Sequence, residues 1–196
     1  MQKGRPRQFD LDDAIDKAML VFWEKGYERT TIPDLIEAIG INRPSLYSAF
    51  GSKEGLFQAT LDRYRSGPAS YVNRALEEPD AYSVFRSLLY GVIELVTDTE
   101  RPGGCLFVCG TLSISDVPGS VSSKLAERRI LGELDIRKRF ERALEEGDLP
   151  KGSDPSSLAM LASTLLWGLS VQASNGAKRS QLNSVAEIAL KAFPKD

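Results

Sequence analysis

Helix-capping residues and glycines divide the first part of the chain, up to Phe57, into a series of short helices. Side chains of the Asp, Thr, Asn and Ser type accept hydrogen bonds from the first backbone N–H groups of a helix, and glycine favours its end. The expected caps and stops alternate along the sequence: Asp10 and Gly26, Thr31 and Gly40, Asn42 and Gly51, and then Ser52, which caps a fourth helix. Three helices in about fifty residues, with a tight glycine-containing turn between the second and third, are typical of a helix-turn-helix.

The rest of the chain shows helical periodicity and no strand-like alternation of any length. Gly67 and Pro68 separate it from the first part of the chain. The expected helices are Tyr71 to Leu76, Ala81 to Thr97, Cys105 to Ile114, Val121 to Glu146, Pro155 to Ala173 and Leu182 to Phe193. The sequence therefore predicts an all-α protein with a helix-turn-helix domain in residues 1–65 and a helical bundle in residues 66–196.

Composition argues against catalysis. The chain of 196 residues contains no histidine, so the commonest general base and the usual zinc ligand are missing. No phosphate-binding loop or nucleophile motif is present, and we expect no enzymatic activity, no metal and no cofactor. The longest apolar run, Leu158 to Val171, is shorter than the roughly 20 residues that span a bilayer. We expect a cytoplasmic protein that does not enter a membrane.

One face of the third helix has the chemistry of a DNA-reading surface. With Leu46 and Phe50 turned inward, a helical wheel places four residues on a different face: Arg43, Pro44, Tyr47 and Ser48. The second helix of a helix-turn-helix enters the major groove of DNA, where a guanidinium, a phenol and small side chains can meet bases and phosphates. The net charge is only −2, so we expect DNA contact to be local.

The run "TTIPDLIEAIGINRPSLYSAFGSKEGLF", residues 30–57, resembles the N-terminal signature of the TetR/AcrR family of bacterial transcriptional regulators. This resemblance implies that Arg43, Pro44 and Ser45 face the bases and that Tyr47 contacts a phosphate. It also implies a phosphate contact for Lys53, at the positive end of the fourth helix.

Three further DNA contacts rest on less specific signals. Thr30 and Thr31 open the second helix and can bond a phosphate, although Thr31 is first of all a cap. The basic residues of the N-terminus are as typical of an unstructured end as of a DNA-binding arm: Lys3, Arg5 and Arg7. The alternative for Tyr47 is a half-buried core tyrosine, and for Arg43 and Lys53 a solvated helix surface.

The family resemblance further implies a small-molecule effector bound among the central helices of the second domain. The candidate lining residues are Phe85, Leu89, Cys105, Phe107, Cys109, Phe140 and Trp167. For each of them, ordinary core packing is the alternative. Cys105 and Cys109 also allow a regulator that senses oxidants or electrophiles through a thiol, although a cysteine in apolar surroundings is normally inert.

The last two expected helices offer more apolar surface than one domain can bury. Small residues in the first of them allow close helix approach, and the last helix has an apolar stripe. The expected dimer residues are Ala159, Ala162, Gly168, Leu182, Val185 and Ala189. The alternative is that both helices belong to the internal core.

These observations together predict a homodimeric repressor that binds a pseudo-palindromic, double-stranded DNA operator and is released by a small-molecule effector. The competing class is a small-molecule binding protein that does not bind DNA. That class would explain the apolar bundle but would leave the outward Arg43, Tyr47 and Lys53 without a role.

Overall fold

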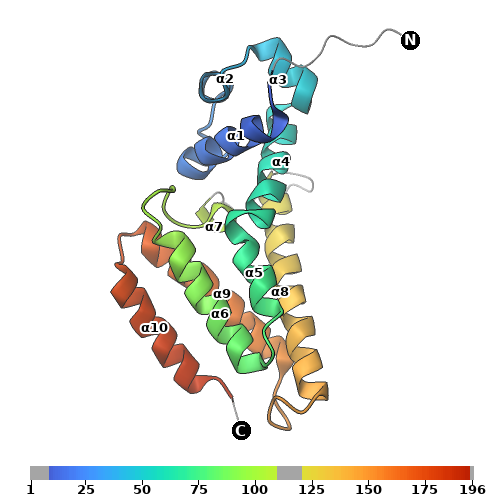
Figure 1. The fold of residues 1–196 in the computed structure, drawn as a ribbon, viewed down its shortest axis with the longest axis vertical. Helices are drawn as coiled ribbons and strands as arrows, with labels where there is room; N and C mark the ends of the chain where they lie inside the picture. Colours follow the sequence, from blue (N-terminus) through green and yellow to red (C-terminus); the bar gives the residue numbers. More distant parts are fainter. Residues whose placement is uncertain (1–8, 110–120, 195–196) are drawn as a thin grey trace, which may run out of the picture.

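The structure, a computed structural model, describes residues 9–109 and 121–194. All regular secondary structure in these residues is helical, which confirms the all-α prediction. Figure 1 shows helices α1 to α4 gathered at one end of an elongated molecule and the longer helices of the bundle at the other. The elements are α1 (Leu11–Lys25), α2 (Ile32–Ile39), α3 (Arg43–Phe50), α4 (Lys53–Ser66), a 3-10 turn (Pro68–Ser70), α5 (Tyr71–Leu76), α6 (Ala81–Val96), α7 (Leu106–Cys109), α8 (Val121–Glu145), α9 (Pro155–Ser174) and α10 (Arg179–Ala192).

Each of the four expected caps forms the hydrogen bond that the sequence predicts. The Asp10 carboxylate accepts from the backbone of Asp12 at 2.7 Å, and the Asn42 side chain accepts from Ser45 N–H at 2.9 Å. The Thr31 and Ser52 hydroxyls do the same for α2 and α4. The glycines that end α1, α2 and α3 all have a positive φ, a conformation that glycine adopts without strain. Local chemistry alone therefore sets the lengths of the first helices.

Among the described residues of the bundle, the start of α10 is the helix boundary that differs from the sequence-based prediction by more than one residue. Helix α10 begins at Arg179, before the expected start at Leu182, because the backbone N–H of Lys178 donates to the Gln181 side chain at 2.8 Å and closes the first turn. Helix α7 covers Leu106–Cys109, and the rest of the helix expected to reach Ile114 lies outside the described residues.

The N-terminal helices share their core with later segments. Apolar residues of α1 to α4 pack together with Leu95, Leu106 and Leu125, which come from α6, α7 and α8. The predicted domain boundary after residue 65 lies inside α4, whose last residue is Ser66. Helix α4 therefore belongs to the N-terminal end of the molecule and also leads directly into the bundle (Figure 1).

Aromatic and polar contacts fix α1 and α4 on α7. The Tyr64 ring packs edge-on against Trp23, with centroids 4.9 Å apart, and against Phe107 at 5.0 Å. The Trp23 indole N–H donates to the Gly104 carbonyl at 3.1 Å, and the Tyr64 hydroxyl accepts from Leu106 N–H at 3.3 Å. Burial raises the pKa of Tyr64, so its hydroxyl stays neutral at this contact.

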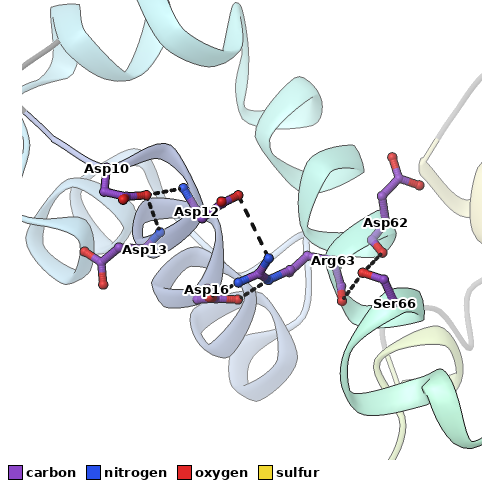
Figure 2. A network of polar contacts seen from close by, with 7 residues as sticks. All are labelled: Asp10, Asp12, Asp13, Asp16, Asp62, Arg63 and Ser66. Atoms are coloured by element: carbon purple, nitrogen blue, oxygen red, sulfur yellow. Dashed lines mark hydrogen bonds and ion pairs between the residues drawn. The ribbon is translucent and has the colours of Figure 1, made fainter.

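An ion pair on the outside of the N-terminal helices holds α4 on α1. Figure 2 shows Arg63 reaching from α4 to α1, where its guanidinium donates to both carboxylate oxygens of Asp16 at 2.7 and 2.5 Å. Asp12 lies further away, 3.9 Å from the same guanidinium. The pair is bidentate, a geometry that gives orientation as well as attraction.

A second core holds the bundle together. Helix α6 is central, with residues such as Phe85 and Leu89 fully buried between α9 and α10, and Phe85 stacks on Phe193 at 4.5 Å. Helix α9 is longer than its expected apolar run and could cross a membrane by length and composition alone. Its contacts with α6 and α8 account for the buried part of its apolar surface.

Gly55 allows α3 and α4 to approach closely. A Cβ at Gly55 would lie 2.2 Å from the Phe50 carbonyl oxygen at the end of α3. We predict that Gly55→Ala lowers the free energy of unfolding by about 1–3 kcal/mol, because the backbone of α3 must move to relieve the clash. Chemical denaturation followed by circular dichroism measures this loss.

The control for that measurement is Gly132→Ala in α8, where a Cβ would meet nothing within 4 Å. Because alanine is the better helix former, this variant should be as stable as the unmodified protein or more stable by up to about 1 kcal/mol. Equal stability of Gly55→Ala and Gly132→Ala would contradict the close contact between α3 and α4.

Candidate nucleic-acid interface and ligand cavity

Helix α3 presents its polar face outward, as the helical wheel predicts. Leu46 is completely buried under the helix and fixes its rotation. Four residues on the other side are exposed: Arg43, Pro44, Tyr47 and Ser48. Ser45 is half-buried, and its backbone N–H is bonded to the Asn42 cap. The candidate DNA-reading face is thus held in place by one buried leucine and one cap.

Arg43 and Tyr47 form a stacked pair on this face. The Arg43 guanidinium carbon lies 5.7 Å from the centre of the Tyr47 ring, within the range of a cation–π contact. Tyr47 remains 38% exposed. Stacking on the ring restricts the arginine while leaving its N–H groups able to meet a base edge or a phosphate.

Lys53 is positioned by a residue that the sequence analysis did not single out. Its ammonium nitrogen lies 4.2 Å from the centre of the Tyr27 ring, in the loop after α1. Lys53 is the first residue of α4, so its charge adds to the positive end of that helix. Tyr27 and Lys53 are too far apart in the sequence for a local pattern to predict this contact. It forms because α1 packs against α4.

The two threonines before α2 differ in exposure. Thr30 is 1% exposed, and its hydroxyl donates to the Gly26 carbonyl at 2.7 Å. The side chain expected to bond a phosphate therefore points into the loop after α1. Thr31 is exposed, and its hydroxyl is bonded to Asp34. Hydrogen bonds from Lys25 and Thr31 lower the pKa of Asp34 to about 2, so the cap is charged at neutral pH.

The expected N-terminal arm lies outside the described residues: Lys3, Arg5 and Arg7.

A cavity of about 100 Å³ lies among α5, α7, α8 and α9, next to the end of α4. Three of the expected ligand-lining residues are on its wall: Cys105, Phe107 and Trp167. Three others are fully buried in the core and do not line it: Phe85, Leu89 and Phe140. Phe85 and Phe140 pack against Phe193, because α10 covers this side of α6. Cys109 is the last residue of α7.

The cavity wall also contains residues that the sequence analysis did not select. Seven of them are charged or polar residues of α4, α5 and α8: Arg65, Tyr71, Asn73, Arg128, Arg129, Glu133 and Asp135. Burial lowers the pKa of the Arg129 guanidinium and raises that of the Tyr71 hydroxyl. Charged residues are usually exposed on the protein surface, so the sequence alone does not indicate that these residues line a cavity.

The residues expected at a dimer interface divide between the inside and the outside of the chain. Ala159, Ala162 and Leu182 are buried in the chain's own core, so their helix faces meet other helices of the same chain and not solvent. Gly168 and Val185 are exposed, and Ala189 is half-buried. The large apolar side chains that α9 and α10 do expose are Met160, Leu161, Trp167, Val185 and Ile188.

Comparisons with known proteins place this architecture in a family. Residues 14–60 match the family model described as bacterial regulatory proteins, tetR family. The chain is 33% identical to the HTH-type transcriptional repressor ComR of Escherichia coli K12 over 194 residues, which cover 98% of this chain and 92% of ComR. The repressor BdcR of the same organism is 46% identical over 61 residues, about a third of either chain.

A solved structure is similar over nearly the whole length. It is a cysteine mutant of the TetR-family transcriptional regulator CifR, complexed with a 26-bp double-strand operator DNA. It is 40% identical, covers 97% of this chain and 100% of its own, and superimposes with a TM-score of 0.91. The likeness to ComR and CifR extends through the bundle as well as the helix-turn-helix. This chain belongs to the tetR family of bacterial regulatory proteins.

Proposed function

We propose that this protein is a transcriptional repressor that binds operator DNA through α3 and the start of α4. The observation that carries the proposal is the exposed face of α3, on which Arg43 stacks over Tyr47 above the buried Leu46. The similar regulator CifR is complexed with operator DNA, and ComR is named a repressor. In this arrangement Arg43 reads a base edge in the major groove, while Tyr47 and Lys53 contact phosphates on either side. Repression takes place in the cytoplasm.

The protein acts as a homodimer through an exposed apolar stripe on α9 and α10, which consists of Met160, Leu161, Trp167, Val185 and Ile188. Met160 is 61% exposed and Ile188 68% exposed, and a helical surface of this kind is stabilised when a second copy covers it. Pairing α9 and α10 of two copies around a two-fold axis makes a four-helix interface. The two α3 helices would then enter successive major grooves about 34–36 Å apart or somewhat more, on a pseudo-palindromic operator.

A small-molecule effector bound in the cavity releases the repressor. The cavity lies beside the end of α4, the helix that continues into the DNA-binding end. An effector that fits one arrangement of α4 better than another shifts the population toward that arrangement, by as much as the difference in affinity. The expected result is a pair of α3 helices at a spacing that no longer fits the operator.

Removal of the proposed DNA contacts one at a time tests the role of α3 and the start of α4. Arg43→Ala should cost roughly 1–3 kcal/mol of operator binding and relax sequence preference, since it removes a base contact. Lys53→Ala should weaken binding to all sequences alike and reduce the salt slope by about one, since it removes a phosphate contact. Electrophoretic mobility shift with the DNA upstream of the protein's own gene, repeated at several salt concentrations, measures both.

The control is Arg142→Ala, which removes the same charge from an exposed site on α8, where Arg142 pairs with Glu146. It should leave both affinity and salt slope unchanged. If Arg43→Ala and Lys53→Ala behave like this control while all three proteins are folded, α3 is not the reading helix.

A charge placed in the proposed interface tests dimerisation. Ile188→Glu places a charge in the centre of the exposed stripe on α10 and should produce a folded monomer that has lost operator affinity. Ile130→Glu is the matched control, because Ile130 is 66% exposed but lies on α8, away from that stripe. Sedimentation at micromolar concentration measures the mass of both variants. A monomeric unmodified protein, or a dimeric Ile188→Glu, would be incompatible with the proposed interface.

A further inference from the structure

The wall of the cavity beside α4 carries five charged side chains. Three arginines contribute to it, Arg65 from α4 and Arg128 and Arg129 from α8, against the two carboxylates Glu133 and Asp135. The remaining wall is largely apolar and includes the rings of Tyr71, Phe107 and Trp167. An apolar pocket with a few convergent charged groups is the typical form of a small-molecule site, and the charged groups decide which ligand it accepts.

Two of these arginines join α4 to α8. Arg65 Nη2 lies 2.9 Å from a carboxylate oxygen of Asp135, and Arg128 Nη2 lies 2.5 Å from a carboxylate oxygen of Asp62. Lys124 and Glu54 pair further toward the start of both helices. Figure 1 shows α8 running beside α4 and α5. The ion pairs of Arg65 and Arg128, two residues of the cavity wall, therefore also hold α4 against α8.

The third arginine lies further inside. Arg129 Nη1 donates to the backbone carbonyl of Phe107 at 2.8 Å, and burial lowers the pKa of its guanidinium. The guanidinium is thus partly desolvated at the cavity wall, where a carboxylate placed against it makes a charge-assisted contact with little competition from water. A guanidinium has five N–H donors in a planar fork that matches the two oxygens of a carboxylate.

We propose that the cavity binds a small organic anion, in which a carboxylate sits against Arg129 and Arg65 and an apolar body of about one aromatic ring packs among Tyr71, Phe107 and Trp167. The cavity of about 100 Å³ is smaller than the roughly 150 Å³ that accommodates benzene, so a ligand the size of benzoate fills it completely and requires side chains of the wall to move outward. This ligand class rests on the proposed function, in which the same cavity holds the effector.

The proposed ligand also accounts for release. A carboxylate against Arg65 competes with Asp135, the partner of Arg65 on α8. Both side chains of that pair are partly exposed, so solvent screens the attraction and a carboxylate of the ligand can replace Asp135. Loss of the pair frees the end of α4 from α8, and α4 carries the helix-turn-helix with it.

Binding of three probes of similar size and different charge tests the ligand class. Benzoate, benzamide and benzylamine are titrated by calorimetry into the full-length protein without DNA. Benzoate should bind with a Kd of about 1 mM or tighter. The neutral benzamide and the cationic benzylamine should bind at least about tenfold more weakly, because they lack the charge-assisted contact with the guanidinium.

Charge-removing variants locate the binding. Arg129→Gln should abolish the preference for benzoate, and Arg142→Gln, on the exposed far end of the same helix, should retain it. Arg65→Gln makes the same test at a partly exposed position if Arg129→Gln fails to fold. The proposal is overturned if benzoate does not bind at about 10 mM, if benzamide binds as well as benzoate, or if the folded cavity variants keep the preference.

Operator binding with and without benzoate is measured separately. Saturating benzoate should weaken binding to the upstream DNA by about fivefold or more, the lower end of typical allosteric coupling. Benzoate that binds without changing operator affinity would overturn the release mechanism. If the unliganded protein does not bind this DNA, the proposed function fails, while the titration without DNA still decides whether the cavity selects anions.

Discussion

The position of the DNA-binding end depends on the buried ring of Tyr64. This side chain of α4 packs edge-on against Trp23 of α1 and Phe107 of α7, and its hydroxyl accepts a hydrogen bond from the backbone of Leu106. Three helices that are distant in the sequence therefore meet at one residue. Because Tyr64 is fully buried, any displacement of α7 relative to α4 must disturb these contacts.

The contacts that join α4 to the rest of the molecule differ in strength. Aromatic pairs such as those of Tyr64 contribute about 0.5–1.5 kcal/mol each beyond the burial of their area, and they are shielded from water. The ion pairs of α4 with α8 are partly exposed and contribute about 1 kcal/mol or less. The coupling energies of allosteric proteins, about 1–3 kcal/mol, correspond to the exchange of a few such ion pairs, whereas displacing Tyr64 would also expose its buried ring to water. A ligand in the cavity is therefore expected to exchange ion pairs while Tyr64 stays in place.

The DNA-reading face of α3 is held in place by its neighbours, although the helix is only eight residues long. Its start is fixed by the Asn42 cap, its rotation by the buried Leu46, and its end by the close approach to Gly55. A short isolated helix is marginal in water, so these neighbours supply the stability that α3 lacks. Side chains such as Arg43 can then be presented to DNA without an ordering cost in the backbone.

The sequence by itself determined the all-α class, the caps of the first four helices and the outward face of α3. These features depend on hydrogen bonds and periodicities within a few residues of each other, so they are visible without any tertiary contact. The family was visible in the same way, because residues 30–57 form one local pattern.

Only the tertiary structure decided what the apolar and charged residues of the bundle face. Phe140 and Trp167 are both large aromatic residues of apolar helices, yet one is fully buried in the core and the other lines the cavity. Ala162 is turned into the core, and the exposed stripe of α9 runs through Met160 instead. Arg129 lies on the cavity wall, although charged residues usually face solvent. An apolar helical pattern shows that a face is buried, but which neighbour buries it depends on how distant helices pack, and that information is not local.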